Sequence, residues 1–430
     1  MRQAVPQSTT TDRTERAALV GLFNGASRRF DPEHALDELA GLADAAGARV
    51  VLRVLQERAR PDPATFLGSG KVISLAASCD ELGANVVIFD NELTPAQLRN
   101  LEDKLGRKVV DRTQLILDIF ARRARTREGK LQVELAQLKY LLPRLVGSSD
   151  ALSRQGGGIG TLGPGETKLE TDRRRIRHRI TVLSTEIETV RRRRTQLRER
   201  RHKAAVPTVA LVGYTNAGKT TLFNALTGGD AVASDALFVT LDPLVRKVKL
   251  PDRLELLASD TVGFIERLPT SLVAAFRATL EEVAAADLLL HVIDASSPDR
   301  ERHMDAVRSV LTEVGAERVP SLEVFNKCDQ LDDAERARVR ALYPGALCLS
   351  AKTGEGRDDL IAAMEGRLQL GTVRVTLEFD GHDEDRDRIA QLYRIGRILR
   401  HVAADGHVSI DAVLPRRLLD RFPSARVLTA

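Results

Sequence analysis

The chain of 430 residues is 43% hydrophobic and 29% charged, which predicts two to four packed domains and excludes disordered and collagen-like classes. Its three cysteines are far apart without a CxxC pair, which argues against a zinc site or a disulfide framework. The lack of a secretory signal or a long apolar stretch predicts a cytoplasmic protein with reduced thiols and no stable membrane insertion. The net charge of +5 is uneven: residues 166–203 hold 14 basic and 6 acidic residues, a net +8, whereas the other 392 residues hold 51 and 54, a net −3.

Residues 1–112 predict a small α/β domain. Short apolar runs typical of buried strands alternate with helical stretches; the expected strands are 49–55, 84–90 and 108–110, and the expected helices are 71–82 and 95–105. Thr94 followed by Pro95 predicts a helix start, because a threonine hydroxyl caps free amides and proline is tolerated in the first turn.

Residues 113–205 predict an antiparallel helical hairpin. Apolar residues repeat at spacings of four and three in both arms, namely Leu131, Leu135, Leu138, Leu142 and Leu145, then Ile176, Ile180, Leu183, Ile187, Val190 and, one heptad later, Leu197. Residues 147–165 between them contain seven glycines and cannot remain helical, so we expect a glycine-rich tip. The basic segment belongs to the second arm, where it is either a solvated helix face or a surface for a polyanionic partner.

Residues 206–368 predict a mostly parallel α/β domain, and residues 369–430 predict a small α/β domain after it. The expected parallel strands are 208–212, 287–293, 321–325 and 346–349, with an antiparallel pair at 244–250 and 253–258. In the tail, we expect a strand with alternating apolar residues at 373–379, a helix at 386–402 and an extended segment at 408–413.

Residues 213–220, GYTNAGKT, fit the phosphate-loop pattern GxxxxGK[ST] and lie between an expected strand and an expected helix. Such a loop cradles phosphates with its backbone amides, so the expected nucleotide contacts are Gly213, Tyr214, Thr215, Asn216, Ala217, Gly218, Lys219, Thr220 and Thr221. Lys219 would reach the β- and γ-phosphates, and the Thr220 hydroxyl would bind Mg²⁺. The alternative, a fortuitous glycine turn, becomes negligible once the following motifs are counted.

Three further motifs follow in the order that a GTPase requires. Asp260, Thr261, Val262 and Gly263 follow a strand; the Asp260 carboxylate would hold Mg²⁺, and the Gly263 amide would contact the γ-phosphate. Asn326, Lys327, Cys328 and Asp329 follow another strand, and a carboxylate there accepts two hydrogen bonds from guanine that adenine does not offer. Ser350, Ala351 and Lys352 would close over the base through a backbone amide. The motifs therefore predict GTP and GDP as ligands.

Thr240 is the candidate switch threonine, because it lies between the phosphate loop and Asp260; the bland alternative is an ordinary strand or turn residue. Its neighbours Phe238, Val239, Leu241 and Asp242 complete the expected nucleotide contacts. The expected metal ligands are thus Thr220, Thr240 and Asp260, and the expected catalytic residues are Lys219, Thr240 and Gly263.

Phe264 directly follows Gly263, where many regulatory GTPases have a glutamine that orients the attacking water. Phenylalanine cannot orient water, so we expect slow hydrolysis until another group or a bound partner does so. Asn216 resembles the asparagine of GTPases that use K⁺ in place of an arginine finger; capping of the loop is the ordinary alternative.

Several strings resemble the HflX family of ribosome-associated GTPases over nearly the whole chain. They are FDNELTPAQLRNLE at 89–102, DRT at 111–113, LLPRL at 141–145 and QGGGIGTLGPGETKLE at 155–170. The last string departs from the family pattern at Leu162, usually arginine, and at Lys168, commonly glutamine. If that arginine contacts RNA in relatives, the contact is missing or replaced here.

The resemblance implies a protein of four parts that binds the large ribosomal subunit, with the hairpin tip toward the peptidyl-transferase centre, and dissociates stalled ribosomes under stress. We expect the protein to be a monomer. The residues expected to contact RNA are Arg154, Thr161, Lys168, Arg173, Arg174, Arg175 and Arg177. It also implies a secondary ATPase activity in the N-terminal domain, where residues 68–71, GSGK, are too short for a phosphate loop. The alternatives are a GTP-dependent switch for a protein partner and an RNA-remodelling GTPase.

Overall fold

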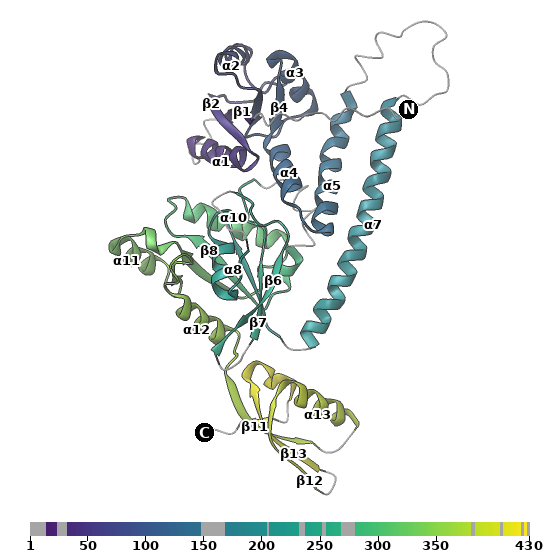
Figure 1. Cartoon of the computed structure of the whole chain (residues 1–430), viewed down its shortest axis with the longest axis vertical. Helices are drawn as coiled ribbons and strands as arrows, with labels where there is room; N and C mark the ends of the chain where they lie inside the picture. Colours follow the sequence, from purple (N-terminus) through teal and green to yellow (C-terminus); the bar gives the residue numbers. More distant parts are fainter. Residues whose placement is uncertain are drawn as a thin grey trace, which may run out of the picture. The chain divides into compact units, whose positions relative to one another are not determined.

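The computed structural model describes residues 14–23, 32–147, 168–203, 206–231, 237–251, 255–267, 280–379, 383–404, 407–422 and 425–427 (Figure 1). It divides into two compact units. The first contains residues 1–187, 235–239 and 268–275, and the second contains 188–234, 240–267 and 276–430. Within the described ranges, every helix is too short or too polar to cross a bilayer.

The first unit contains a parallel sheet in the order β2-β1-β3-β4. Its strands are β1 (Glu15–Phe23), β2 (Ala48–Glu57), β3 (Val86–Phe89) and β4 (Lys108–Asp111), and its helices are α1 (Pro32–Ala45), α2 (Ser69–Leu82), α3 (Pro95–Leu105) and α4 (Arg112–Arg123). The predicted strands and helices from residue 49 to 110 are confirmed. The central strand β1 and the helix α1 were not predicted, although Ala17–Val20 is fully buried, as expected of a parallel strand covered on both faces.

The helical stretch predicted from Thr113 to Leu145 is divided into two α-helices. Helix α4 ends at Arg123, and α5 (Arg127–Leu141) begins after Thr126, whose hydroxyl accepts a hydrogen bond from the Gly129 amide at 3.0 Å. A 3-10 helix, η2 (Leu142–Gly147), continues the chain. The division allows α4 to bury Ile116, Ile119 and Phe120, while α5 turns to meet a different partner.

That partner is α7 (Lys168–Lys203), the second arm of the predicted hairpin. Three residues of each predicted stripe meet in one apolar cluster, formed by Leu131, Leu135, Leu138, Ile180, Leu183 and Ile187. The prediction is confirmed only in part, because Leu142 and Leu145 lie in η2 and not in the α-helical arm. Ion pairs flank it: Arg127 lies 3.1 Å from Glu186, and Arg179 donates two hydrogen bonds to Glu134 at 2.7 and 2.8 Å. The pairing order runs in opposite directions along the two helices, so the arms are antiparallel. Most of the predicted tip, residues 148–165, lies outside the described residues.

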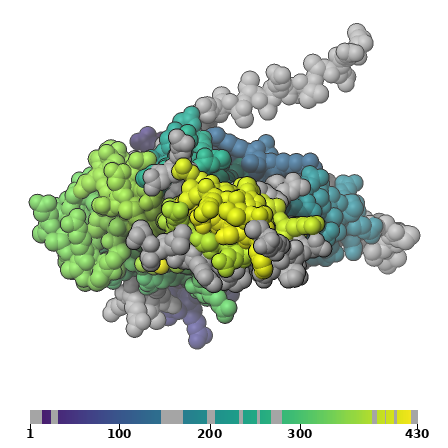
Figure 2. All heavy atoms as spheres, turned by 90° about the horizontal axis from the view of Figure 1, so that it is seen from below, coloured from purple at the N-terminus to yellow at the C-terminus, as the bar shows by residue number. Residues whose placement is uncertain are grey.

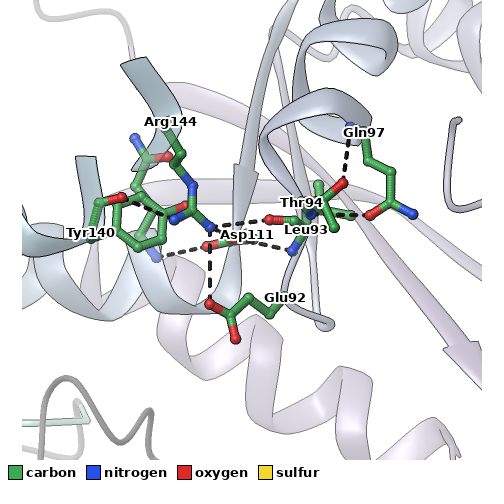
Figure 3. Close-up of polar contacts among 8 residues, drawn as sticks. Glu92, Leu93, Thr94, Gln97, Asp111, Tyr140 and Arg144 are labelled. Carbon is green, nitrogen blue, oxygen red and sulfur yellow. Dashed lines mark hydrogen bonds and ion pairs between the residues drawn. The ribbon is translucent and has the colours of Figure 1, made fainter. Parts of the chain in front are cut away.

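Arg144 connects the first arm of the hairpin to the sheet (Figure 3). Its guanidinium lies over the Tyr140 ring at 3.4 Å and donates hydrogen bonds to Leu93 O and Asp111 Oδ2, both at 3.1 Å. Beside it, Thr94 and Gln97 form the predicted cap of α3. Three of the strings that carried the family resemblance therefore meet at one structural joint.

The second unit contains a mixed sheet in the order β10-β9-β8-β5-β7-β6, parallel except for β6. Its strands are β5 (Thr208–Gly213), β6 (Leu244–Lys249), β7 (Glu255–Asp260), β8 (Leu288–Asp294), β9 (Ser321–Asn326) and β10 (Leu347–Cys348). Its helices are α8 (Lys219–Thr227), α10 (Arg300–Glu313), η4 (Cys328–Gln330), α11 (Asp333–Leu342) and α12 (Arg357–Arg367). The predicted parallel strands and the antiparallel pair are confirmed, so the α/β fold class is correct.

The tail forms an antiparallel sheet in the order β12-β13-β11-β14. Its elements are β11 (Thr372–Phe379), α13 (Asp383–Ile395), β12 (Arg397–Ala404), β13 (His407–Pro415), η5 (Arg416–Arg421) and β14 (Ala425–Val427). The helix predicted at 386–402 is wrong in its second half, because Gly396 ends it and residues 397–404 pair with β13. A Cβ at Gly396 would lie 2.4 Å from Leu414 Cδ2, so a larger residue here would have to displace the buried Leu414 side chain. Much of this tail is visible as the yellow surface in Figure 2.

Candidate nucleotide site

The phosphate loop connects the central strand β5 to α8. Gly218 precedes α8 with φ +89°, and a Cβ there would lie 2.2 Å from Asn326 Nδ2. Glycine is therefore required both for the backbone conformation and for the close approach of β9. The loop leads directly into the N-terminus of α8, and the free amides of a helix N-terminus are groups that bind phosphates.

Lys219 is buried beneath this loop. Its ammonium donates hydrogen bonds to Gly213 O at 3.0 Å and to Tyr214 O at 2.7 Å. Burial lowers the pKa of Lys219 to about 8, while Asp260 acts in the opposite direction. Polyphosphate would supply the negative charge that this buried ammonium lacks.

The three predicted metal ligands lie together. Thr220 Oγ1 donates to Asp260 Oδ2 at 2.7 Å, Thr240 Oγ1 lies 3.0 Å from the same oxygen, and the two hydroxyls are 2.8 Å apart. Burial raises the pKa of Asp260, and its other oxygen, Oδ1, is buried without a hydrogen-bond partner in the described part of the chain. An unsatisfied buried carboxylate oxygen beside two hydroxyls has the hard-donor chemistry that suits Mg²⁺. The described residues hold no cluster of three or more His, Cys, Asp and Glu for another metal.

The segment after Asp260 pairs with the phosphate loop. The Thr215 amide donates to Phe264 O at 2.7 Å, and the Phe264 amide donates to Gly213 O at 3.1 Å. A Cβ at Gly263 would lie 3.0 Å from Thr215 Cα and 3.2 Å from Lys219 Nζ, so glycine is required for this approach. The Phe264 side chain is 1% exposed, so it is buried in the interior.

Glu266, at the end of this segment, is held by the phosphate loop and by α10. Arg302 donates from Nε and Nη2 to the two Glu266 carboxylate oxygens. The Glu266 amide donates to the Tyr214 hydroxyl at 3.0 Å, and the Tyr214 ring stacks on His303 with centroids 3.9 Å apart. Sequence reasoning included Tyr214 but missed the other three residues, because no motif marks a helix that reaches this segment only through the fold.

The predicted base-binding residues meet beside the phosphate loop. Residues 326–329 form the base loop, which begins with Asn326. The Asn326 side chain donates to Ala217 O at 2.9 Å and accepts from the Ala351 amide at 2.9 Å, so it holds the base loop against the phosphate loop. Lys327 pairs with Asp294, an unpredicted residue, at 2.7 Å. Asp329 is exposed. Ser350 is buried, and its hydroxyl accepts from the Thr353 amide at 3.2 Å. The Ala351 amide is engaged with Asn326, so it is not open to a base in this conformation.

The segment around Thr240 has two different environments. The Phe238 side chain is buried against Phe120 of α4, with ring centroids 4.7 Å apart. Leu241 is also buried, whereas Val239 and Asp242 are half-buried. Thr240 hydrogen-bonds through its hydroxyl to the other two predicted metal ligands, Thr220 and Asp260.

The predicted RNA contacts are only partly within the described residues. Arg154 and Thr161 lie outside them, and Lys168 begins α7 without a described side chain. Arg174, Arg175 and Arg177 are exposed on α7, whereas Arg173 is half-buried with its Nε atom fully buried. Three of the four predicted arginines of α7 therefore present charge to solvent.

Three family models match the chain. Residues 33–121 match the N-terminal region of GTP-binding GTPases, residues 123–201 match their middle region, and residues 208–327 match a model described as a 50S ribosome-binding GTPase. These ranges together cover most of the chain.

Relatives called GTPase HflX are similar over nearly the full length. The protein from Caldanaerobacter subterraneus is 50% identical over 408 residues, which is 95% of this chain and 93% of the relative. The Escherichia coli protein is 45% identical over 420 residues, 96% and 97% of the two chains. A GTP-binding protein from Sulfolobus solfataricus, solved with GDP, is 25% identical, covers 83% of this chain and 99% of its own, and has a TM-score of 0.44.

Proposed function

The chain belongs to the HflX family of GTPases, and we propose that it binds the large ribosomal subunit, is stimulated by the ribosome and dissociates or rescues stalled ribosomes under stress. GTP hydrolysis is its activity, and its family is one of 50S ribosome-binding GTPases. In this proposal, the protein is a cytoplasmic monomer, partly associated with ribosomes.

Mg²⁺ is the metal that we propose for the oxygen cluster of Thr220, Thr240 and Asp260. The buried, unpartnered Asp260 Oδ1 supports it, because a divalent cation would satisfy that oxygen. Bound there, Mg²⁺ would neutralise charge on the β- and γ-phosphates. K⁺ is a second proposal: Asn216 is exposed and makes no side-chain hydrogen bond within the described ranges, so the structure shows no capping of the loop by this residue.

Lys219 and Gly263 are the groups that we propose to stabilise the transferred phosphoryl group. For this, the Lys219 ammonium exchanges its bonds to Gly213 O and Tyr214 O for phosphate oxygens. The Gly263 amide lies on the segment that already packs against Thr215 and Lys219. In this proposal, Thr240 binds the metal only when a γ-phosphate is present, and its hydroxyl already contacts the other two metal ligands.

The burial of Phe264 supports stimulation by a partner. Its side chain is apolar and 1% exposed, so this position offers no polar group that could orient the attacking water. Lys219 stabilises charge but does not position the nucleophile. A group supplied by the bound partner, or one brought into place by it, would raise turnover.

The exposed arginines of α7 support ribosomal RNA as the partner. Arg174, Arg175 and Arg177 lie next to the glycine-rich signature, and arginines in this density attract phosphate backbones. Aromatic residues are 4% of the chain and none is tryptophan, which favours phosphate and shape contacts over base stacking.

Turnover assays test the proposal. GTP and ATP turnover by the purified protein is measured alone and with small subunits, large subunits or free ribosomal RNA at fixed salt. We expect large subunits to stimulate GTP turnover most strongly, after which subunit splitting is assayed by sedimentation. Equal stimulation by free RNA would favour an RNA-remodelling GTPase, and no stimulation would favour a switch for a protein partner.

A further inference from the structure

We propose that Cys328 and Cys348 form a reversible disulfide that weakens the binding of guanine nucleotides. Cys328 lies between Lys327 and Asp329 in the base loop, and Cys348 ends β10, two residues before Ser350. The effect on binding rests on the proposed role of Asp329 in reading guanine, whereas formation of the bond does not.

The backbone places the two cysteines around one carbonyl group. Cys348 is opposite Phe325 in the parallel pairing of β10 with β9. Phe325 O accepts a hydrogen bond from the Leu349 amide at 2.8 Å and another from Cys328 Sγ at 3.2 Å. The Cys328 amide in turn donates to Leu349 O at 3.1 Å. Cys328 is therefore held against the end of β10, next to Cys348.

Both side chains belong to the same apolar cluster, which also contains Phe325, Met304 and Val339. Cys328 lies beyond the end of β9 and is not the strand partner of Cys348, but its amide donates to the carbonyl of Leu349, the residue after Cys348. The two backbones are therefore adjacent, as a disulfide requires, since it spans Cα atoms about 4.4–6.8 Å apart.

The different exposure of the two thiols sets the order of the chemistry. Cys328 is buried, and burial together with the neighbouring Cys348 thiol raises the pKa of Cys328 to about 12, so it reacts poorly with an oxidant from solvent. Cys348 is partly exposed, which makes it the first target of a peroxide. The adjacent Cys328 then reacts because it is already in place.

The steps balance with a peroxide as the oxidant. Hydrogen peroxide converts the Cys348 thiol to a sulfenic acid, and one water is released. The Cys328 sulfur attacks the sulfenic sulfur; the S–S bond forms, the S–O bond breaks, and the departing hydroxide takes the Cys328 proton as a second water. Two molecules of a reducing thiol return two electrons and two protons, restore both cysteines and leave joined as a disulfide.

The bond changes the base loop because it requires about 2.05 Å between the sulfurs. Cys328 Sγ must turn away from Phe325 O, and the loop around it is tightly constrained, since Lys327 has φ +64° and pairs with Asp294. Movement of Cys328 displaces the Asp329 carboxylate beside it. Guanine would then lose a charge-assisted hydrogen bond.

The experiment compares the full-length wild type with Cys348→Ser and with Cys79→Ser, a matched control at a buried cysteine of the first unit. Each protein is treated with hydrogen peroxide, digested without reduction and analysed by mass spectrometry, and GDP affinity is measured before and after treatment. We expect a Cys328–Cys348 linked peptide and at least about a tenfold rise in the Kd for GDP in the wild type and in Cys79→Ser. A phosphine reductant should reverse both, and Cys348→Ser should show neither.

Separate Cys328 and Cys348 peptides after treatment, or an equal loss of affinity in Cys348→Ser, would overturn the proposal. A linked peptide with unchanged GDP affinity would overturn the regulatory effect. Asp329→Asn is measured in parallel without oxidant: normal GDP affinity in that variant would reject Asp329 as the guanine reader, while the peptide map would still decide on the disulfide.

Discussion

Arg302 of α10 donates two hydrogen bonds to the Glu266 carboxylate, at the end of the segment that pairs with the phosphate loop. Both side chains are mostly buried, with 25% and 15% exposure. Because Glu266 also donates from its amide to Tyr214 OH, the ion pair fixes the segment on which Gly263 and Phe264 lie.

Reversal of this ion pair should lower GTP turnover, and exchange of its charges should restore it. Glu266→Arg or Arg302→Glu alone places like charges together and should reduce ribosome-stimulated kcat about tenfold, whereas the double variant should recover most of the loss. Arg308→Glu is the matched control. Arg308 is on α10 like Arg302, but it pairs with Glu323 of β9 and does not contact this segment. A double variant as impaired as the singles would reject a specific ion-pair role.

Asp329→Asn should reduce the preference for guanine. The carboxylate accepts two hydrogen bonds from guanine, and an amide in its place can donate to the 2-oxo group of xanthine. We expect GDP to bind about 10- to 100-fold more weakly and XDP more tightly, in competition binding. Asp333→Asn, an exposed neighbour in α11, is the control. Unchanged guanine preference would place the base reader elsewhere.

Charge reversal on α7 should abolish cosedimentation with large subunits. The variant Arg174→Glu, Arg175→Glu and Arg177→Glu changes the three exposed arginines and leaves the half-buried Arg173 in place. A variant with the same charge change on exposed residues elsewhere is the control: Arg338→Glu, Arg340→Glu and Arg367→Glu. The wild type should dissociate as salt rises. Normal cosedimentation of the α7 variant would show that this helix face does not bind RNA.

His291 of β8 should make the protein less stable in acid. Burial lowers the pKa of His291 to about 4, assisted by Arg308 and Lys219. The unfolded chain therefore takes up this proton below about pH 6.5 while the folded chain does not, so the contribution is present above pH 6.5 and is lost as the pH falls toward 4. His291→Gln should flatten the pH dependence of the unfolding free energy, by as much as about 3 kcal/mol over this window. An unchanged pH dependence of the unfolding free energy in His291→Gln would contradict a lowered pKa of His291 in the folded protein.

Arg144→Ala should destabilise the first unit. Asp111 is fully buried and receives a hydrogen bond from Arg144, so removal of the guanidinium leaves a buried carboxylate without its cation. We expect a loss of about 3 kcal/mol in urea unfolding followed by circular dichroism. Arg53→Ala breaks an exposed ion pair with Asp37 and should cost less than about 1 kcal/mol. Equal losses in the two variants would argue against the joint at Arg144.

The local sequence determined much of the architecture, because loop motifs and helical periodicity depend on residues that are close together in the chain. The GYTNAGKT loop between an apolar run and a helix, and the carboxylate at the end of β7, are set by residues adjacent in the chain. The apolar stripes of α5 and α7 likewise predicted their mutual packing, since helical periodicity places each stripe on one face. The helix predicted at 386–402 failed where strand pairing overrode the local pattern at Gly396.

Only the tertiary structure decided which distant residues meet. Arg302 reaches Glu266 because α10 packs beside the phosphate loop. Phe238 packs on Phe120, which is 118 residues earlier in the chain, because burial of both rings removes apolar surface from water. Cys328 and Cys348 are 20 residues apart in the chain, and the parallel pairing of β9 with β10 brings them together. Motifs identified the chemistry of this protein from neighbouring residues, whereas the contacts proposed to regulate it depend on strand order and helix packing, which no local pattern encodes.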